Sequence, residues 1–545
     1  MENLWMALSK YLMLVLMSVF ILLSFFIMRR KSKSQRNALL KAQNIIMFII
    51  HAVAYIVIYI NQPTDTIIIF YGAQVIYFIL VIGLYSVFYD NINKVLINNM
   101  CMFLCVSFIM LTRIKLSMSI NQFKIVVIAT IITMMIPYCM NKFAFLKNLT
   151  WVYGVVGMGL LAFVLVLGQT SYGAKLAIDL GFFSIQPSEF VKITYVFFLA
   201  AMFERSTSFK NIVVSAIFAG IHVIVLVLSK DLGSGLIFFL VYVFMVYSAT
   251  CHAFYLVGGL GFGAGASVIA YKLFYHVQER VIAWKDPWSV IDDAGYQVTQ
   301  SLFAIGTGGW LGMGLYQGLP TSIPVVSQDF IFSAISEELG GYFALAIIFL
   351  CFSCFVIFMQ VAIHQKTMFF KMISVGLGIS YAVQVVLTIG GAIKFIPSTG
   401  VTLPFISYGG SSMLSTMVMF AVVQGLSIAI DNESEKFKKM PSKRLKADAR
   451  IVGRNTNRNT DRMTEQFYEE PMYQQEKMNQ PSIHTIPKRE EKEQRKGQKK
   501  GTTKSSSAGK RKAAGSSSGK QSSGKNTNTS KNGKQAGTNK KKRGE

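Results

Sequence analysis

Three carboxylates with the potential for chemistry stand close together in an otherwise apolar stretch of the chain. Asp329 directly precedes the apolar run that begins at Phe330, and Glu337 and Glu338 follow within the same run. A charged side chain at the centre of a bilayer costs roughly 2.5 to 3.5 kcal/mol on insertion scales, so such a cluster indicates a functional site. Acids are also common in the first turn of an ordinary helix, where they favour the helix dipole. The rest of the sequence decides between these two interpretations.

The composition is that of a chain that crosses a membrane many times. Its 545 residues are 52% hydrophobic, the mean hydropathy is +0.44, and apolar blocks reach the length of about 20 residues that spans a bilayer. We therefore predict an all-α polytopic integral membrane protein with about thirteen transmembrane helices. The predicted spans are approximately 7–28, 41–61, 67–89, 96–114, 122–140, 150–169, 189–205, 211–229, 234–250, 253–275, 331–360, 370–392 and 405–430.

Basic residues fix the expected orientation of these spans. They cluster at 29–41, 142–147, 205–210, 366–371 and after 436, and the positive-inside rule places such loops in the cytoplasm. With thirteen spans, all of them fall on one side only if the N-terminus is outside and the C-terminal tail is cytoplasmic. The first block shows no small-residue cleavage pattern, so we expect a retained helix and no cleaved signal peptide. Loops 170–188 and 276–330 are then expected outside, where the acidic residues gather.

The last part of the chain differs from the rest. Residues 431–545 contain 30 Lys and Arg against 13 Asp and Glu, and from Lys499 onward they contain no aromatic or branched apolar residue. Such a segment cannot bury enough surface to offset its ordering entropy, so we predict a basic disordered tail. Tethered inside a bilayer, it is expected to meet anionic membrane lipids, at about 1 kcal/mol per charge, and we expect no nucleic acid as partner.

Glycines concentrate between Gly306 and Gly314 in the expected outer loop. Their spacing fits neither the dinucleotide fingerprint nor the phosphate-binding loop, and no strand is predicted before them. We expect a flexible, half-buried outer segment that is able to cover a cavity.

Several motifs in sequence order resemble one family. They are Gln186-Pro-Ser-Glu189 with Lys192, Asp231-Leu-Gly-Ser234, Asp286-Pro-Trp288, Gly295-Tyr-Gln297 with Gln300-Ser301, the glycine run, Asp329-Phe-Ile-Phe332 with Glu337-Glu-Leu-Gly340, and Pro397-Ser-Thr-Gly400 through Leu403-Pro404 to Ser407-Tyr-Gly-Gly-Ser-Ser412. Together they are similar to the FtsW/RodA/SpoVE proteins of the shape, elongation, division and sporulation (SEDS) family. The resemblance divides the chain into an N-terminal extension with three transmembrane helices (1–91), the family core (92–430) and the tail (431–545).

The resemblance implies a function for the core. Family members have ten core helices and polymerise lipid II into peptidoglycan strands outside the bacterial plasma membrane, usually with a class B penicillin-binding protein. The essential acid of the family matches Asp329, the outer glutamate and lysine match Glu189 and Lys192, and Arg280 matches the arginine before the Pro-Trp segment. This chain has Leu176-Ala177 where relatives often have Arg-Trp, which puts a lipid or sugar contact in doubt.

Other polar residues of the motifs are candidates for contact with the substrate. Thr399 stands where division-type relatives often have lysine, which argues against a dedicated division protein. The remaining candidates for substrate binding, all in or beside matched motifs, are Asp231, Gln297, Glu337, Glu338, Lys394, Ser398 and Ser411.

The chemistry can also be argued from the residues alone. Joining a sugar hydroxyl to an anomeric carbon that bears a lipid pyrophosphate requires a base and cations for the leaving group. Asp329 in a partly dry pocket should have a raised pKa, which suits a general base. Arg280, Lys285, Lys394 and Lys192 are the outer cations that could hold pyrophosphate, alone or with a divalent cation such as Mg²⁺ or Mn²⁺, for which no ligands are assigned. Because Glu189 and Lys192 are three residues apart on one helix face, they can also pair.

Two other functions fit the sequence. A transporter that flips the lipid-linked precursor would favour paired broken helices and charges near the middle of the bilayer. A non-catalytic scaffold for division or elongation would leave Asp329 dispensable.

Overall fold

The computed structural model describes residues 2–30, 32–142, 144–171, 174–179 and 184–439. They belong to the first of two compact units, Met1–Ile451, and the second unit, Val452–Glu545, lies outside the described residues. Nearly all of the predicted tail (431–545) therefore lies outside the described residues as well.

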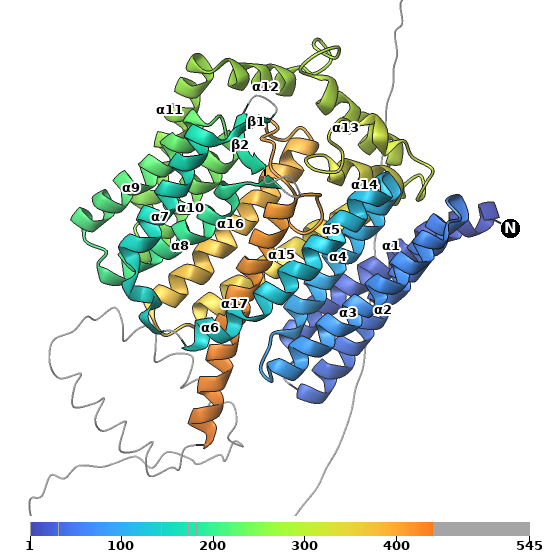
Figure 1. Cartoon of the computed structure of the whole chain (residues 1–545), viewed down its shortest axis with the longest axis horizontal. Helices are drawn as coiled ribbons and strands as arrows, with labels where there is room; N and C mark the ends of the chain where they lie inside the picture. The colour runs from blue at the N-terminus through green and yellow to red at the C-terminus, as the bar shows by residue number, and fades with distance from the viewer. Residues whose placement is uncertain (1, 31, 143, 172–173, 180–183, 440–545) are drawn as a thin grey trace, which may run out of the picture. The chain divides into compact units, whose positions relative to one another are not determined.

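The described chain is built almost entirely of helices (Figure 1). The elements in chain order are α1 (Glu2–Arg29), α2 (Lys33–Asn61), α3 (Asp65–Phe88), α4 (Lys94–Ile114), α5 (Leu116–Met134), α6 (Ile136–Lys142), η1 (Ala144–Asn148), α7 (Thr150–Leu167), β1 (Gln169–Ser171), β2 (Ala174–Asp179), β3 (Ser184–Ile185), α8 (Pro187–Arg205), α9 (Phe209–Leu228), α10 (Leu232–Thr250), α11 (Ala253–Leu273), α12 (Tyr275–Lys285), α13 (Tyr296–Gly308), η2 (Pro320–Ser322), α14 (Ile331–Leu339), α15 (Gly341–Ile363), α16 (Met368–Ala392) and α17 (Gly410–Lys439).

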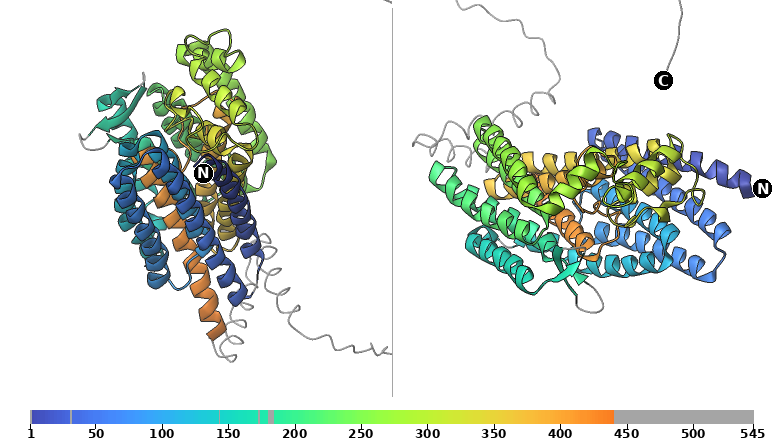
Figure 2. Two further views of the ribbon diagram at one scale, coloured as in Figure 1. Left: turned by 90° about the vertical axis from the view of Figure 1, so that its right-hand side faces the viewer. Right: turned by 90° about the horizontal axis from the view of Figure 1, so that it is seen from above.

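The helices agree with the predicted multi-span architecture. Within the described residues, eleven helices are long and apolar enough to cross a membrane. Helix α7 is shorter, and α8 is less apolar because it contains Glu189, Lys192, Glu204 and Arg205. Together with α7 and α8, these helices occupy all of the predicted spans, and the protein is a multi-pass membrane protein. Helices α12 and α13 lie at one end of the bundle, opposite α6 (Figure 1; Figure 2).

The three helices of the N-terminal extension pack against the core through α4 and α15. The contact includes polar side chains in an apolar setting: Gln43 Nε2 donates to Ser24 Oγ (2.7 Å), and Ser24 Oγ donates to Asn99 Oδ1 (3.0 Å). Asn99 Nδ2 in turn donates to Ser353 Oγ at 2.8 Å. Polar side chains often join helices in this way where lipid offers no hydrogen-bond partner. The extension is therefore an integral layer of the described bundle, and α4 lies buried beneath it.

The predicted span 331–360 is wrong at its N-terminal side. The apolar run is divided at Gly340, whose φ of +92° suits glycine, into the short helix α14 and the membrane span α15. The glycine run is bonded to this break: Met313 N–H donates to Glu337 O (2.9 Å) and Gly341 N–H donates to Gly309 O (2.9 Å). A Cβ atom on Gly308 would lie 2.1 Å from Ser336 O, so glycine permits this close approach. The segment is half-buried, as expected, but these backbone bonds hold it against α14 and α15, so the expectation of a flexible segment is wrong.

A small antiparallel sheet occupies part of the segment that was expected to be an outer loop. Strand β2 lies between β1 and β3, with Thr170 paired to Lys175 and Ile178 paired to Ile185. Leu176 and Ala177 are in β2, and their side chains lie outside the described part of the structure. The sheet is a minor addition to an otherwise helical membrane protein.

Residues 397–409, in the segment between α16 and α17, form non-helical backbone that bonds to side chains of α4, α5 and α16, and we call them the 397–409 loop. Surrounding side chains satisfy its carbonyl groups: Thr388 Oγ1 donates to Val401 O (2.8 Å), and Gln384 Nε2 donates to Thr402 O (3.0 Å). Ser107 Oγ donates to Ile406 O at 2.9 Å, and Gln122 Nε2 donates to Ser407 O at 3.2 Å. Irregular backbone at this depth persists only where protein or water satisfies it.

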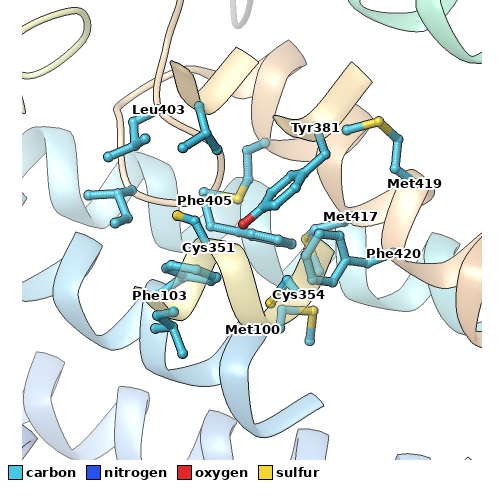
Figure 3. Packing of buried hydrophobic residues seen from close by; sticks show 14 of the residues in the cluster. Met100, Phe103, Cys351, Cys354, Tyr381, Leu403, Phe405, Met417, Met419 and Phe420 are labelled. Carbon is cyan, nitrogen blue, oxygen red and sulfur yellow. The ribbon is translucent and has the colours of Figure 1, made fainter. Parts of the chain in front are cut away.

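An aromatic anchor also holds this loop in place (Figure 3). Phe405 has a φ of +64°, a conformation that is costly for a residue with a side chain. Its ring stacks on Phe103 of α4 with centroids 6.0 Å apart and meets Phe420 of α17 edge-on at 4.6 Å. The buried ring therefore compensates for the strained backbone and joins the loop to the core.

We predict that Gln122→Leu destabilises the protein. The change removes the amide that donates to Ser407 O and accepts from Gly409 N–H (3.3 Å), and it leaves one buried and one partly buried backbone group without a partner. The expected loss is about 1 to 3 kcal/mol for each orphaned group, measurable as earlier thermal unfolding in detergent. Gln360→Leu is the matched control because Gln360 is exposed on α15. Equal melting of both variants would contradict the role of Gln122.

Candidate functional site

Asp329 lies in the segment between η2 and α14. Hydrogen bonds from the 397–409 loop hold the two residues that precede it. Tyr408 N–H donates to Ser327 O at 2.7 Å, and the Ser407 hydroxyl donates to Gln328 O. These two bonds fix the residues just before Asp329. The Asp329 carboxylate itself makes no hydrogen bond or ion pair with any of the described residues, although Asp329 is half-buried. The backbone of Asp329 is therefore held in place, its carboxylate is available to a ligand, and the residue lies outside the membrane spans.

Arg280 of α12 is the nearest cation to this carboxylate. Its Nη1 donates to Ser398 O at 2.9 Å, which joins α12 to the 397–409 loop. Gly400 lies between the two charged groups: a Cβ atom there would be 3.6 Å from Arg280 Nη2 and 3.7 Å from Asp329 Oδ2. The φ of Gly400 is +72°, so this position favours glycine on backbone grounds as well. The structure therefore brings together three predicted site residues: Asp329, Arg280 and Ser398.

The electrostatics of Asp329 follow from burial and from Arg280. Burial raises the pKa of the Asp329 carboxyl from 3.8 to about 6, and the positive charge of Arg280 opposes this rise. The carboxylate is therefore largely ionised at neutral pH but is a stronger base than an ordinary aspartate. This agrees with the raised pKa that the sequence predicts.

Other cations gather near Arg280. Lys230 and Arg280 both lie close enough to His276 of α12 to lower its pKa, although burial is the larger cause. Trp284 Nε1 donates to Lys394 O at 3.2 Å and holds the backbone of that residue. The sequence analysis missed Lys230 because only the fold brings it near His276, and it missed His276 although this residue lies four positions before Arg280 on the same helix. Lys285 is exposed at the end of α12.

Thr399 completes this part of the site. Its backbone carbonyl lies against Gly233, where a Cβ atom would be 2.8 Å from Thr399 O. Its Oγ1 is buried without a hydrogen-bond partner. The predicted candidates Ser398 and Thr399 are therefore adjacent to Asp329 and Arg280, and Thr399 has a hydroxyl available for a ligand.

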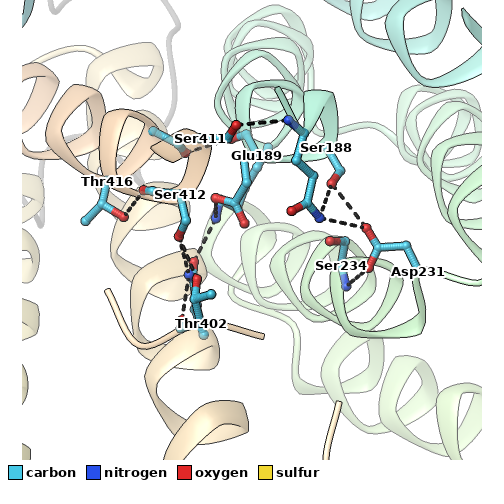
Figure 4. A network of polar contacts seen from close by, with 12 residues as sticks. Ser188, Glu189, Asp231, Ser234, Thr402, Ser411, Ser412 and Thr416 are labelled. Carbon is cyan, nitrogen blue, oxygen red and sulfur yellow. Dashed lines mark hydrogen bonds and ion pairs between the residues drawn. The ribbon is translucent and has the colours of Figure 1, made fainter. Parts of the chain in front are cut away.

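A second polar network lies where α8, α10 and α17 meet (Figure 4). Asp231 accepts from Ser234 N–H (3.1 Å) as the cap of α10 and from Ser188 Oγ (3.1 Å). Burial raises the pKa of Asp231. Gln186 N–H donates to Ser411 Oγ at 2.9 Å. Asp231 and Ser411 thus have protein partners here, and their predicted contact with substrate stays a prediction.

Glu189 and Lys192 form a buried ion pair in this network. Lys192 Nζ donates to Glu189 Oε2 (2.9 Å) and to Gln384 Oε1 (2.7 Å), and the Lys192 side chain is only 3% exposed. Gln384 also donates to the 397–409 loop, so the pair is coupled to the backbone that positions Asp329. The expected pairing is confirmed, and the expected contact of Lys192 with pyrophosphate stays a prediction.

Glu337 and Glu338 are engaged with the glycine run and with α4. Glu337 Oε1 accepts from Leu319 N–H (2.9 Å), and Glu338 Oε1 accepts from Arg113 Nε (2.8 Å). Burial raises the pKa of Glu338 to about 7, and Arg113 opposes this rise. Arg113 also lies over the ring of Tyr316 at 4.3 Å. These contacts support a structural role, and substrate contact by either glutamate stays a prediction.

Two predicted features have weaker structural support. Gln297 is exposed on α13, with no side-chain hydrogen bond to the described residues. No group of three or more His, Cys, Asp or Glu residues that could hold a metal ion occurs in the part of the chain that the structure describes. A protein-only metal site is therefore not formed by these residues.

The match to a family model decides the classification. The model for FtsW/RodA/SpoVE, described as a cell cycle protein, matches residues 92–432. This chain belongs to the FtsW/RodA/SpoVE family. The matched region contains Asp329, Arg280 and the 397–409 loop, whereas α1–α3 lie before it.

Curated relatives within the FtsW/RodA/SpoVE family include named enzymes. The chain is 35% identical over 303 residues to "Peptidoglycan glycosyltransferase RodA" of Mycobacterium tuberculosis, covering 51% of this chain and 63% of that protein. It is 32% identical over 293 residues to "Probable peptidoglycan glycosyltransferase FtsW" of Saccharophagus degradans, covering 50% of this chain and 73% of that protein. The chain thus spans less than two thirds of the length of the mycobacterial relatives.

A solved structure shares the family fold. A chain from "Structural coordination of polymerization and crosslinking by a peptidoglycan synthase complex" superposes with a TM-score of 0.53 at 23% identity. The match covers 62% of this chain and 98% of that chain. The helical arrangement of this family member is therefore found in an independent structure.

We predict that removing one charge of the Glu189–Lys192 pair lowers the stability of the protein more than removing both charges does. Lys192→Met leaves a buried carboxylate without its cation, which should cost about 3 to 5 kcal/mol of stability. The double change Glu189→Gln with Lys192→Met removes both charges and should recover much of this loss, as followed by thermal unfolding in detergent. A double variant as unstable as Lys192→Met would contradict the structural role of the pair.

Proposed function

We propose that this protein is a glycosyltransferase that polymerises lipid II, a lipid-linked disaccharide, into peptidoglycan strands on the outer side of the bacterial plasma membrane. The observation that carries the proposal is the placement of Asp329, free of protein partners, beside Arg280 at Gly400. The names of the curated relatives support the same reaction class. The site combines an available base with cations, which the transfer of a sugar from a pyrophosphate requires.

The proposed reaction uses Asp329 as the general base. The ionised carboxylate accepts the proton of the attacking sugar hydroxyl as the hydroxyl oxygen bonds to the anomeric carbon of the donor. The bond between that carbon and the pyrophosphate oxygen breaks, and lipid pyrophosphate leaves with the bonding electrons. A carboxyl pKa of about 6 leaves the base ionised at pH 7 and able to hold the proton better than an ordinary aspartate.

The cations near Arg280 are proposed to stabilise the leaving group. Arg280 is held by Ser398 O through one guanidinium nitrogen, and its exposed remainder can donate to phosphate oxygens. Lys230 and Lys394 add positive charge nearby, and the Thr399 hydroxyl can contact the same ligand. Positive groups fixed before the reaction stabilise charge that develops in the transition state.

We keep a divalent cation, bound together with the substrate, as part of the proposal. Mg²⁺ is often bound by one or two carboxylates together with substrate phosphates. Asp329 is assigned here to the base and the described residues contain no cluster of three or more metal-binding side chains, so no protein ligand is assigned and the ion would be held mainly by substrate phosphates. Such an ion would neutralise pyrophosphate charge as a Lewis acid.

Orientation and partner follow from the same proposal. The basic loops favour an outside N-terminus and a cytoplasmic C-terminal tail, which puts α12 and Asp329 outside. The structural neighbour comes from a complex described as coupling polymerization and crosslinking. We therefore propose a class B penicillin-binding protein as the crosslinking partner of this chain.

We predict that Asp329→Asn and Asp329→Ala abolish polymerisation while the protein stays folded. A positioned base contributes roughly 10²- to 10⁴-fold, so purified variants given labelled lipid II should form little or no glycan on a gel. Asp293→Asn, an exposed acid in the loop after α12, is the matched control and should retain activity. Full polymer yield from Asp329→Asn would refute the assignment of the base.

The stability of Asp329→Asn provides a check on folding. The folded-state pKa of Asp329 is raised above its ordinary value, so the native state loses stability as pH rises through about 6 and the carboxyl ionises. At pH 8 the Asn variant should therefore unfold at the same temperature as the wild type or higher. Below about pH 4 this difference should vanish, because the carboxyl is then protonated in both the folded and unfolded states.

The pH dependence of the wild-type reaction tests the base independently. Because the ionised form is active, the polymerisation rate should fall as pH is lowered through about 6. The measurement is the initial rate of polymer formation between pH 4 and 8. A lower midpoint near 4, the value of an ordinary aspartate, would contradict the dry environment assigned to Asp329.

A further inference from the structure

A cavity of about 290 Å³ lies between the N-terminal extension and the core, away from the proposed catalytic site. Two of the three helices that form it, α2 and α3, precede the region that matches the family model. Its polar lining residues are Asn37, Lys41 and Asn44 of α2, Tyr85 and Ser86 of α3, and Lys94 and Asn98 of α4.

The polar side of the cavity favours an anion that also carries a hydrogen-bond donor. Neither Lys41 nor Lys94 forms an ion pair with any of the described residues. Two lysines without carboxylate partners at one cavity attract a phosphate group. Asn44 Oδ1 is buried without a hydrogen-bond partner, so it can accept from a ligand hydroxyl. Asn98 Nδ2 already donates to Gln43 Oε1 at 3.0 Å.

The position of the cavity corresponds to the headgroup level of a bilayer. Lys94 is the first residue of α4, and Ser86 lies in the last turn of α3, so the cavity is at the ends of membrane spans. Basic pockets between helices at this level bind lipid head groups. Leu40, Ile82 and Ile97 supply an apolar side to the same cavity.

Apolar surface continues beside the cavity. Ile45 of α2 is 59% exposed and Val87 of α3 is 77% exposed in a bundle that spans a membrane. These side chains can contact acyl chains, whereas a soluble phosphate ester would make no use of them. Headgroup and chain contacts together distinguish a lipid from a free phosphate.

We propose that this cavity binds the headgroup of an anionic glycerophospholipid with a free hydroxyl, of the phosphatidylglycerol class. Lys41 and Lys94 contact the phosphate, and the Asn44 amide oxygen accepts from the headgroup hydroxyl. The bound lipid joins the extension to the core. Asn93 N–H donates to Gln424 Oε1 at 3.1 Å, so the start of α4 is also tied to α17 at this end.

The test is lipid binding by the full-length protein, measured by native mass spectrometry. Phosphatidylglycerol is titrated against a phosphatidylcholine background for the wild type and for Lys41→Gln with Lys94→Gln. The control Lys33→Gln with Lys147→Gln also removes two positive charges, from exposed positions that do not line the cavity. Because the basic tail is present in every variant, its contribution to lipid binding is the same throughout.

We expect the cavity variant to bind phosphatidylglycerol roughly tenfold more weakly than the wild type and the control do. Asn44→Asp, which places a negative charge beside the phosphate, should weaken binding similarly. Thermal unfolding in lipid-free detergent should be unchanged in the lysine variants, since their ammonium groups have no ion-pair partner among the described residues. Equal phosphatidylglycerol binding by the folded cavity variant and the control would overturn the proposal.

A second arm separates lipid from soluble phosphate. Glycerol phosphate is titrated alone and then in competition with phosphatidylglycerol. The proposal requires phosphatidylglycerol to bind more tightly and to displace glycerol phosphate. Glycerol phosphate that phosphatidylglycerol fails to displace, or equal binding of phosphatidylcholine, would overturn the assignment of an anionic lipid.

Discussion

The structure depends on satisfying non-helical backbone inside a membrane protein. The 397–409 loop cannot bond to lipid, so side chains from four surrounding helices, α4, α5, α12 and α16, supply partners for its backbone, including Ser107, Gln122 and Gln384. The same loop then bonds to Ser327 and Gln328 and so fixes the backbone immediately before Asp329. The hydrogen bonds that satisfy the backbone of this loop thus also hold the segment that positions the proposed base.

Among the described residues, two ion pairs contrast with the unpaired carboxylate of Asp329. Lys192 pairs with Glu189 within α8 at 2.9 Å, and Arg113 of α4 pairs with Glu338 of α14 at 2.8 Å. Asp329 differs because its carboxylate has no hydrogen-bond or ion-pair partner among the described residues. The guanidinium of nearby Arg280 instead donates a hydrogen bond to the backbone carbonyl of Ser398. An acid kept dry without an ion pair costs stability, which is the signature of a group retained for function. This contrast separates the proposed catalytic acid from the structural acids.

Much of the fold could be predicted from the sequence because membrane spans are encoded locally. Apolar blocks located the helices, and motif order pointed to Asp329 and Arg280. The break at Gly340 was missed because Glu337, Glu338 and the glycines that follow were included in one apolar run, although these residues interrupt it. The pairing of Glu338 with Arg113 was missed because it joins residues 225 positions apart. Lys230 was missed for the same reason, since the fold brings it near His276, whereas His276 lies four residues before Arg280 on α12 and was overlooked although its spacing was visible in the sequence.

The N-terminal extension shows what family motifs alone leave out. Residues 1–91 lack the matched motifs, yet Ser24 and Gln43 take part in a buried network with Asn99 of the core. The extension also contributes most of the residues that line the cavity, from the N-terminal part of α2 and the C-terminal end of α3. Its helices therefore add contacts and a proposed lipid site to a core that is common to the family.

The central claim is that Asp329 and Arg280 act as one unit, in which the arginine charge lowers the pKa of the base. The most direct measurement is the pH profile of polymerisation by Arg280→Gln compared with the wild type. Removing the positive charge should lower the rate and move the acidic midpoint upward from about 6, because burial is then no longer opposed by Arg280. An acidic midpoint unchanged in Arg280→Gln would contradict the account.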